Sequence, residues 1–379
     1  MKNCIIITNS NPSITGGNIT LIERRAFALY EQMGLKTYFL TISRFNPSLG
    51  NESIQYVSIS SIKDIRHFIR RLRPVLVVFY GSTLYLLIGP VKRMLNHYKI
   101  RSNIALDIQG TIKESIEYPT SHLDYLKYHF KRILENRALT KSDIVFVVTD
   151  QQKRDLENVL KHKRHMNTVF YKIRCGVDRV LTIEEKTYNR AKYRQRMGVQ
   201  EDQTVFVYSG NRSKWQKIND VISYFKDIDR FLSNCFFAFF CNADDELKKQ
   251  LSLSFDNNNY LCKLNNKDDY MGYLCACDVG IILRDYNNTN RVAFPNKFSD
   301  YLNAGLLIAM NKAIPEPYDL LLQYNIPFIN TDTRPVEREL DKIMYRKRNL
   351  YSYYDGCNRL CWNELDYQEQ ISKAQIKLD

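Results

Sequence analysis

The chain has 379 residues, a length that predicts about two domains. Apolar residues make up 44% and charged residues 25%, which is typical of a globular protein and excludes intrinsic disorder for most of the chain. The net charge of +14 indicates an acidic partner, which leaves nucleic acid, an anionic membrane surface and a phosphorylated substrate open.

Short apolar runs alternate with amphipathic segments in the first half of the chain. The expected strands are Cys4–Thr8, Thr37–Ile42, Val75–Tyr80, Ile104–Ile108, Ile144–Thr149 and Val169–Ile173. The expected helices run from Ile19 to Met33, where Gly34 ends the helix, from Ile62 to Leu72 and from Asp124 to Thr140.

A stretch without charge, residues 74–91, is long enough to be considered as a membrane span. Gly81, Ser82 and Thr83 divide it, and the part before them is rich in β-forming residues. We therefore expect a buried strand, a turn and the start of a helix in place of a span.

A second series of the same kind begins near residue 204. Its expected strands are Val205–Tyr208, Phe236–Cys241, Tyr260–Leu264, Val279–Leu283 and Leu307–Met310, and its expected helices are Ile218–Leu232, Glu246–Leu253, Tyr270–Ala276 and Lys297–Ala304. Continuous apolar strands separated by helices predict parallel sheets covered on both faces. The sequence thus predicts an α/β protein with two doubly wound, Rossmann-like domains, and a polar, charged boundary at residues 178–203.

The nine cysteines are an odd number, and most lie in apolar runs, which is typical of reduced, buried thiols. The pairs Cys275–Cys277 and Cys357–Cys361 lack a second pair at the spacing of zinc ligands. We expect no metal site.

Three segments have the composition of a phosphate site. Gly16 and Gly17 precede the first helix and would let a ligand approach the backbone, although a tight turn alone also explains them. After the strand that ends near Tyr208, a loop contains Gly210, Arg212, Lys214 and Lys217. Such cations could hold a diphosphate, and the alternative is a solvated basic turn.

The third segment is the helix that starts near Pro295. Lys297 and Asp300 lie three residues apart on one face of it, and Gly305 suits its C-terminal end. Ligands of such sheets bind beyond the carboxyl ends of the strands, so with two facing domains we expect the helix start to face the cleft between them. An ordinary capped surface helix is the alternative.

Together these segments resemble the family 4 glycosyltransferases, which have the two-domain GT-B fold with a cleft between the domains. The resemblance covers nearly the whole chain, and its subgroup builds capsules and other surface polysaccharides. The residues that carry it are Gly16–Gly17, Asp107–Gly110, Ser142–Thr149, Cys175–Asp178, Tyr208–Gly210, Cys277–Ile281 and Pro295–Leu302 with Gly305.

The resemblance implies a role for each segment. The domain at residues 181–350 would bind a nucleotide-sugar donor, and residues 351–379 would form a helical segment that returns to the first domain. Donor binding would involve Gly16, Gly17, Gly210, Arg212, Lys214, Lys217, Lys297 and Asp300, with Asp300 on the ribose. The domain at residues 1–180 would bind the acceptor, with Asp107 and Gln109 at the catalytic position. Glu114 would contact the acceptor, or is a surface acid. No cofactor is implied.

Three features depart from the family pattern: the residue eight positions before Asp300, the residue at position 109, and the lysine spacing in the loop after Tyr208, which is shifted by about one residue. Val292 stands eight residues before Asp300, where many members have a glutamate, and Gln109 replaces a frequent histidine. Glutamine cannot relay a proton at neutral pH. These positions leave open a non-catalytic member that acts as a binding partner in a synthase complex.

Basic residues crowd the first half of the chain and lie among aromatic residues. This pattern suits an anionic membrane leaflet, and solvated helix faces are the alternative. The residues are Arg66, Arg70, Arg71, Arg73, Lys92, Arg93, Lys99, Arg101, Lys127, Lys131, Arg132, Arg137, Lys161, Lys163 and Arg164. We expect a cytoplasmic, peripheral glycosyltransferase at the inner face of the membrane, with a polysaccharide or lipid-linked acceptor. No nucleic-acid motif is present.

Overall fold

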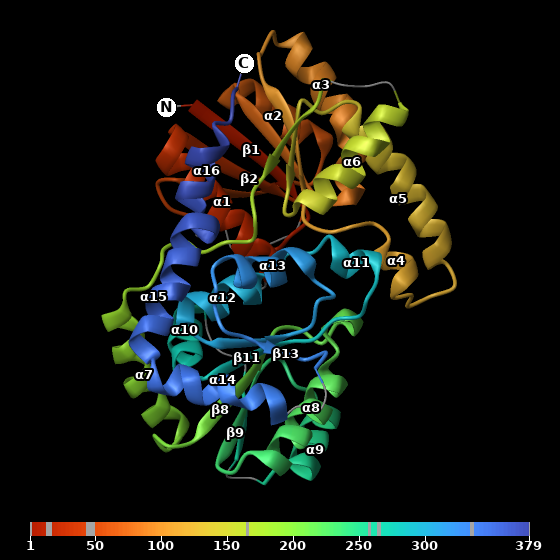
Figure 1. Ribbon diagram of the computed structural model, residues 1–379. Coiled ribbons are helices and arrows are strands. Elements are labelled where there is room, and N and C mark those ends of the chain that lie inside the picture. The colour runs from red at the N-terminus through yellow and green to blue at the C-terminus, as the bar shows by residue number, and fades with distance from the viewer. Residues whose placement is uncertain are drawn as a thin grey trace. The chain divides into compact units, whose positions relative to one another are not determined.

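The computed structural model describes residues 2–12, 17–42, 50–163, 167–256, 259–263, 267–333 and 337–378. It divides into two compact units, and Figure 1 shows the elements of each. Unit 1 comprises Met1–Asp178, Val292–Phe294 and Tyr367–Asp379. Unit 2 comprises Arg179–Arg291 and Pro295–Asp366. Gly16 and Arg164, which the sequence singled out, lie outside the described residues.

The sheet of unit 1 is parallel throughout, with the strand order β3-β2-β1-β4-β5-β6-β7 in the described residues. Its order reverses between β1 and β4, which makes it doubly wound. The side chains of the central strands β4, β5 and β6 are all buried, as expected for strands covered on both faces, whereas the edge strands β3 and β7 are only partly buried. The strands are β1 (Lys2–Thr8), β2 (Leu35–Thr41), β3 (Ile54–Ser58), β4 (Leu76–Tyr80), β5 (Asn103–Ile108), β6 (Ile144–Val147) and β7 (Val169–Lys172).

Helices cover both faces of this sheet. They are α1 (Gly17–Met33), α2 (Ile62–Leu72), η1 (Ser82–Leu87), α3 (Ile88–His97), α4 (Glu114–Glu117), α5 (Asp124–Leu139), α6 (Asp150–His162) and α16 (Tyr367–Ala374). Residues 74–91 form β4, the 3₁₀ turn η1 and the start of α3, as the glycine between them predicted. Within the part of the chain that the structure describes, no helix is both long and apolar enough to cross a bilayer.

The sheet of unit 2 repeats this arrangement, with the strand order β10-β9-β8-β11-β12-β13 among the described residues. Its order reverses between β8 and β11. The strands are β8 (Thr204–Ser209), β9 (Cys235–Phe240), β10 (Tyr260–Cys262), β11 (Val279–Ile282), β12 (Leu307–Met310) and β13 (Ile329–Asn330). All described pairings are parallel. The prediction of two doubly wound parallel sheets is thus confirmed.

The helices of unit 2 include α7, which occupies most of the polar segment at residues 178–203. Thr182 and Glu185 form its capping box, and Gly198 ends it with φ 69°. The helices are α7 (Ile183–Met197), η2 (Lys214–Gln216), α8 (Ile218–Phe231), α9 (Asp245–Ser254), α10 (Lys267–Cys275), α11 (Asn288–Arg291), α12 (Asn296–Ala304), α13 (Pro315–Gln323), α14 (Glu337–Arg348), α15 (Leu350–Leu360) and the π-helical turn η3 (Cys361–Leu365).

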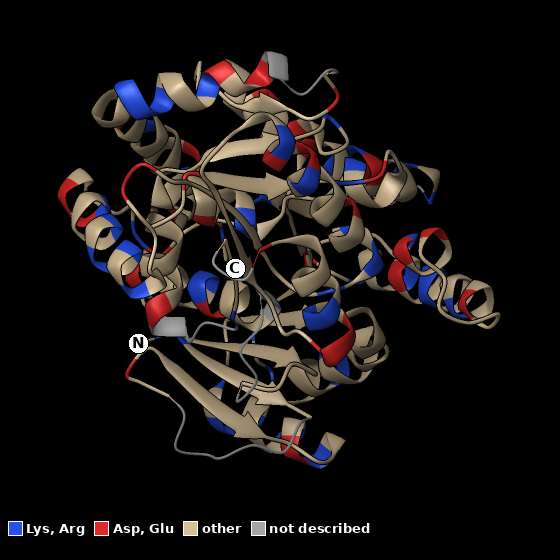
Figure 2. Ribbon diagram, turned by 90° about the horizontal axis from the view of Figure 1, so that it is seen from below, with Lys and Arg blue, Asp and Glu red and all other residues tan. Residues whose placement is uncertain are grey.

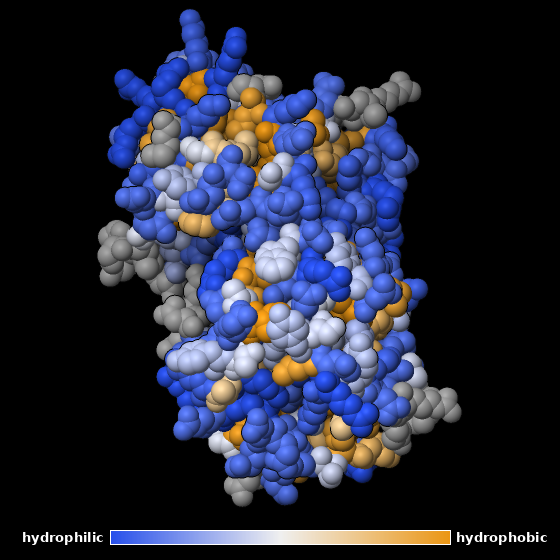
Figure 3. Space-filling model, turned by 60° about the vertical axis from the view of Figure 1, so that its left-hand side comes forward, coloured by the Kyte–Doolittle hydropathy of each residue, from blue (hydrophilic) through white to orange (hydrophobic). Residues whose placement is uncertain are grey.

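The charged residues lie mostly on helices and loops, and the strand arrows carry few of them (Figure 2). On the face seen in Figure 3, hydrophobic side chains form small groups among hydrophilic ones. The described residues include all nine cysteines, each a free thiol, and eight of the nine are buried. The expectation that most of the cysteines are buried is confirmed.

Helix α16 packs on α1 within unit 1, although the two helices lie at opposite ends of the sequence. The Tyr367 amide donates to the Val177 carbonyl at 3.2 Å, and the Arg174 amide donates to Gln370 Oε1 at 2.7 Å. Ile371 of α16 is buried, and it lines a small cavity together with Ile22 and Leu29 of α1. Unit 1 is therefore assembled from segments that are far apart in the chain.

Gly305 gives a testable prediction for the stability of unit 2. Its φ is 77°, and an added Cβ would lie 2.3 Å from a ring carbon of Tyr354. We expect Gly305→Ala to lower the free energy of unfolding by about 2–3 kcal/mol, because it combines backbone strain with overpacking. Denaturant unfolding measures the change.

The matched control is Gly356→Ala. Gly356 lies inside α15, and an added Cβ there would meet nothing within 4 Å. This substitution is expected to raise stability by about 0.5–1 kcal/mol, because alanine favours the helix. Equal effects at both glycines would contradict the role assigned to Tyr354.

Candidate functional site

The carboxyl ends of β8 and β11 mark the point at which the strand order of the unit 2 sheet reverses. Loops that leave such a point diverge, and the space between them is where ligands of doubly wound sheets bind. Residues 210–217 follow β8, and residues 283–295 connect β11 to α12 by way of α11. The candidate site is built from these loops and from the first turn of α12.

Lys297 is the buried cation of this site. Its side chain lies in the first turn of α12, and the residue is 6% exposed. Its Nζ donates to Gln216 Oε1 at 2.8 Å and lies 4.5 Å from the ring centroid of Tyr208. Among the described residues it has no carboxylate partner. Burial lowers the pKa of Lys297 well below its ordinary value, and the neighbouring Arg284 lowers this pKa further.

Arg284 brings a second buried cation to the same oxygen. It lies two residues after the end of β11, is 5% exposed and donates from Nη2 to Gln216 Oε1 at 2.9 Å. Asn311, which follows β12, donates from Nδ2 to the Arg284 carbonyl at 2.7 Å and so fixes this loop. Two like charges therefore lie at one neutral amide oxygen. A phosphate oxygen bound beside them would supply the negative charge that this amide lacks.

Gly210 lets the loop after β8 pass close to Lys297. Its φ is 133°, and an added Cβ would lie 3.2 Å from Lys297 Nζ. The Gly210 amide donates to the Phe240 carbonyl at 3.1 Å, so the loop stays attached to the neighbouring strand. A side chain at this position would strain the backbone and crowd the ammonium group.

Tyr301 holds α12 against the end of β8. Its hydroxyl accepts hydrogen bonds from the Ser209 amide at 3.0 Å and from Ser209 Oγ at 3.1 Å. Its ring packs on Gly280, where an added Cβ would lie 2.3 Å from a ring carbon. Asp300, the preceding residue, is 7% exposed on the same helix, one turn after its start. Tyr301 thus fixes α12, and with it Lys297 and Asp300, against the end of β8.

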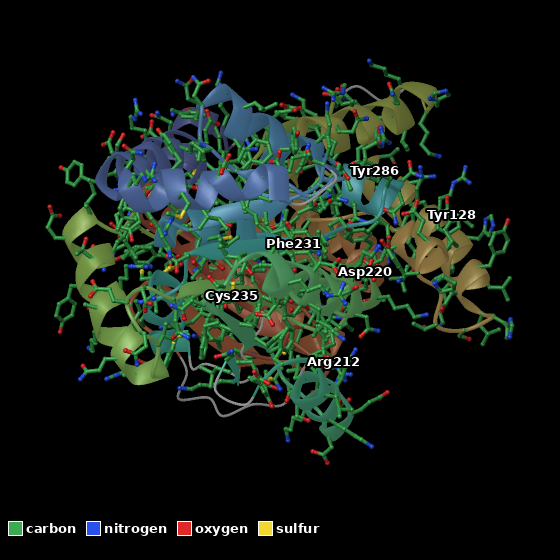
Figure 4. All side chains as sticks on the ribbon, turned by 60° about the horizontal axis from the view of Figure 1, so that its bottom comes forward. Tyr128, Arg212, Asp220, Phe231, Cys235 and Tyr286 are labelled. Carbon is green, nitrogen blue, oxygen red and sulfur yellow. The ribbon has the colours of Figure 1, made fainter. Side chains whose placement is uncertain are left out.

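Of the other cations predicted to hold a diphosphate, two are paired with carboxylates and one is exposed. Arg212 pairs with Asp244 at the N-terminus of α9, and this hydrogen bond raises the pKa of Arg212 (Figure 4). Lys217 contacts Asp220 at 2.7 Å and Asp285 at 2.6 Å. Lys214 is exposed on η2. The structure therefore brings Gly210 and Lys297 together and ties Arg212 and Lys217 to carboxylates.

In unit 1, the corresponding reversal lies between β1 and β4. Gly17 is the first residue of α1, which follows β1. At the carboxyl end of β5, Asp107 is buried in an ion pair with Arg25, which also donates to the Ile173 carbonyl. Burial alone would lower the pKa of Arg25, but Asp107 and its other neighbours hold this pKa above its ordinary value.

Gln109 and Glu114 follow β5. The Tyr80 hydroxyl donates to Gln109 Oε1 at 2.9 Å, and Gln109 Nε2 reaches Asp107 Oδ1 at 3.5 Å. Glu114 is half-buried at the start of α4, where burial raises its pKa and Lys131 partly offsets the rise. The structure thus links Gln109 to Asp107, and it places Glu114 apart from them, on the next helix.

Sequence reasoning assigned no role to Arg284, and it assigned none to Gln216 or Tyr208 as individual residues, although both lie in segments that it singled out. The signal for Arg284 was its position immediately after an apolar strand, where a side chain of a parallel sheet reaches the ligand edge. Gln216 carries no charge and gave no signal of its own. Of the described residues, no three His, Cys, Asp or Glu side chains are grouped as metal ligands would be.

No protein-family model matches the sequence, and no curated protein matches it either. Solved structures do match. Sucrose-phosphate synthase from Thermosynechococcus elongatus has a TM-score of 0.73 and 10% identity, with 98% of this chain and 97% of that chain covered. WaaG, a glycosyltransferase involved in lipopolysaccharide biosynthesis, has a TM-score of 0.67 and 13% identity, with 98% of each chain covered.

The pneumococcal O-GlcNAc transferase GtfA, solved in complex with UDP and GlcNAc, has a TM-score of 0.65 and 9% identity, with 98% of this chain and 97% of that chain covered. Identities this low establish the fold alone. The two parallel α/β units and their likeness to these structures along nearly the whole chain identify the fold as GT-B, as the motifs predicted.

Proposed function

We propose that the chain is a glycosyltransferase that moves one sugar from a nucleotide-sugar donor to a polysaccharide or lipid-linked acceptor. The observation that carries the proposal is the pair of buried cations, Lys297 and Arg284, which share Gln216 Oε1 at the switch point of the unit 2 sheet. The fold supports it, because GtfA shares this fold and was solved with UDP and GlcNAc.

The chemistry of the site follows from its charge. As the bond between the anomeric carbon and the phosphate oxygen breaks, negative charge builds up on the departing diphosphate. Lys297 and Arg284 would stabilise this charge in a site where water is largely excluded. The acceptor hydroxyl forms the new glycosidic bond at the same carbon and gives its proton to an oxygen of the departing diphosphate. We propose retention of anomeric configuration, a hexosyl donor, and catalysis without a metal or another cofactor.

The remaining site residues take roles that the family resemblance suggests. Asp300 would hold the donor ribose, and Gly16 and Gly17 would border the donor phosphates. Asp107 and Gln109 would face the acceptor. Asp107 would position Gln109 by accepting its hydrogen bond while paired with Arg25. Glu114 stays a prediction for the acceptor side. The enzyme would act in the cytoplasm, at the inner face of the membrane, in surface-polysaccharide synthesis.

Calorimetry with a panel of nucleotide sugars tests the proposal. We expect one nucleotide sugar to bind, and mass spectrometry with lipid-linked acceptors should then show transfer of its sugar. A non-catalytic GT-B protein, the alternative suggested by Val292 and Gln109, would show no transfer with any donor. Binding of none of the donors would overturn the proposed site.

Arg212→Ala provides a graded test of the loop after β8. Arg212 must leave Asp244 to reach a phosphate, and we expect its loss to lower kcat/KM for the donor about tenfold, so that most turnover is lost. The matched control is Arg230→Ala, which removes an exposed arginine paired with Asp227 on α8. Unchanged turnover in Arg212→Ala would remove this residue from the donor site.

A further inference from the structure

Helix α5 of unit 1 carries an apolar stripe that faces solvent. Leu123, the residue before α5, and Leu126, Phe130 and Ile133 on the helix are between 51% and 66% exposed. They recur three or four residues apart, the spacing that places side chains on one face of a helix. Figure 1 shows α5 at the outer edge of unit 1, and Figure 4 labels Tyr128 on it.

This stripe is not needed to hold α5 on its unit. A different face of the helix, with Leu134, Ala138 and Leu139, is buried. A helix on the surface of a globular domain ordinarily needs one apolar face, and a second, exposed one marks an interaction surface. The stripe therefore indicates a partner that covers α5 from outside.

A groove of about 490 Å³ begins where the stripe ends. Arg137, four residues after Ile133 on α5, lines it, and so does Leu86, an exposed residue of η1. The opposite wall comes from α3. The residues that line the groove are Tyr85, Leu86, Gly89, Pro90, Lys92, Arg93, Asn96, Leu134, Arg137, Ala138 and Lys141.

The groove is cationic and contains no acid among its lining residues, all of which are described. Lys92 lies 3.9 Å from Asp143 and donates to the Lys141 carbonyl at 3.2 Å. Arg93, Arg137 and the Lys141 ammonium have no carboxylate partner in the described part of the chain. Gly89 leaves room for Lys141, whose Nζ would lie 3.6 Å from an added Cβ. The groove thus offers unpaired cations to an anion.

We propose that α5 and this groove form a docking surface for a membrane of anionic phospholipids. The stripe enters the boundary between headgroups and acyl chains, and the groove takes a lipid phosphate. The apolar stripe suits the acyl chains of such a membrane, and the cations that follow it suit the anionic headgroups above those chains. A purely apolar partner would leave the cations unpaired. This inference rests on the proposed function, because docking on a membrane would bring the enzyme to a lipid-linked acceptor.

Flotation of the full chain with vesicles tests this inference. The wild-type chain is expected to float with phosphatidylcholine vesicles that contain phosphatidylglycerol, and much less with phosphatidylcholine alone. Two double variants should each lower the partition coefficient by more than tenfold. Leu126→Ser with Phe130→Ser removes the stripe, and Arg93→Glu with Arg137→Glu reverses the groove charge.

The controls match these variants in kind but lie in unit 2. Phe231→Ser with Leu253→Ser removes two exposed apolar side chains of α8 and α9, which are 52% and 77% exposed. Lys226→Glu with Lys249→Glu changes the net charge by the same amount on exposed positions. Both controls should float as the wild type does, because the overall charge is not the determinant.

Equal flotation of all variants, or no flotation of the wild type, would overturn the inference. Self-association of the wild type that the stripe variant abolishes, without flotation, would overturn it in favour of a protein interface. Calorimetry of the same variants with the donor separates the two proposals. Loss of lipid binding with unchanged donor affinity supports the docking surface, whereas absence of donor binding in every protein counts against the proposed function alone.

Discussion

Lys297→Met is expected to lower kcat/KM for the nucleotide-sugar donor by about 100-fold or more, because a buried charge that meets the departing diphosphate is removed. The melting temperature should stay the same or rise, since methionine fills a similar volume and no charge remains to be buried. Lys297 is buried beside another cation and has no carboxylate partner among the described residues. A group that lowers the stability of the protein without ligand but strengthens the binding of the ligand is typical of a binding site. Steady-state kinetics and thermal unfolding measure the two effects.

Lys186→Met is the matched control. Lys186 is also a buried lysine of unit 2, with Asn358 Oδ1 as its acceptor and the Tyr354 ring centroid 5.6 Å away. Its surroundings resemble those of Lys297, but it lies on α7, and α7 is not part of the candidate site. The kcat/KM of this variant for the donor should be unchanged. A similar loss of kcat/KM in both variants would mean that burial of a lysine, and not the position of Lys297, matters.

The depressed pKa of Lys297 predicts that donor binding takes up a proton. Above this pKa the empty protein has a neutral Lys297, and a bound diphosphate raises the pKa by favouring the ammonium form. The donor affinity should therefore fall as the pH rises through the interval between the two pKa values. Calorimetry in buffers of different ionisation enthalpy measures the proton uptake. Uptake that persists in Lys297→Met would assign the proton to another group.

Asp278→Ala is expected to lower the free energy of unfolding by about 3–5 kcal/mol, because it leaves buried guanidinium groups without their partner. Asp278 Oδ1 lies 2.7 Å from Arg190 and 2.9 Å from Arg346, and Oδ2 lies 3.2 Å from Arg194. Its Oδ2 also accepts from the Val205 amide at 2.9 Å. This cluster joins α7, α14, β8 and β11, so its loss should destabilise unit 2 as a whole. Denaturant unfolding measures the change.

An exposed ion pair provides the comparison for Asp278. Arg359 and Asp355, on the surface of α15, are 65% and 51% exposed in their side chains. Asp355→Ala should change stability by less than about 1 kcal/mol, because solvent screens such a pair. Equal effects of the two substitutions would show that the arginines around Asp278 gain other partners.

The acid stability of unit 2 should depend on the same carboxylate. Burial alone would raise the pKa of Asp278, but Arg190, Arg346 and Arg194 lower it to about 2. Because the folded-state pKa lies below the unfolded value of about 4, the contribution is fully present above pH ~4 and is lost as the pH falls through ~2. Stability curves of the wild type and of Asp278→Asn should converge over this interval. Parallel curves would assign acid unfolding to other groups.

The sequence predicted most of the fold because buried parallel strands are continuous apolar runs. Strands that lack this property were missed. The strand β3, Ile54–Ser58, is only partly buried, and β13 has two residues. Helix α7 was taken as a polar boundary because few of its side chains are apolar, although Thr182, Glu185 and Gly198 mark its ends. Its buried residues are Lys186, Tyr193 and Arg194, and a hydropathy pattern counts the two cations among them as exposed.

The candidate site was predicted in part, for a related reason. Lys297 and Gly210 stand in segments with their own local signals, a helix start and a glycine after a strand. Arg284 and Gln216 meet Lys297 only because β8 and β11 are neighbours in the sheet, and this pairing cannot be seen in either segment alone. Lys217 looked available from its charge, but Asp285, which contacts it, lies 68 residues away in the chain.

The position of α16 has a consequence for the order of folding during synthesis. A ribosome releases the sheet of unit 1 first, yet the helix that covers α1 emerges only after all of unit 2 has been made. Until then, the side of α1 that α16 covers stays exposed. Unit 1 is therefore translated first but can complete its fold only after unit 2 has been made. A fragment that ends at Asp178 would lack α16 permanently, and we expect it to be poorly soluble. Adding residues 367–379 as a separate peptide should restore its solubility.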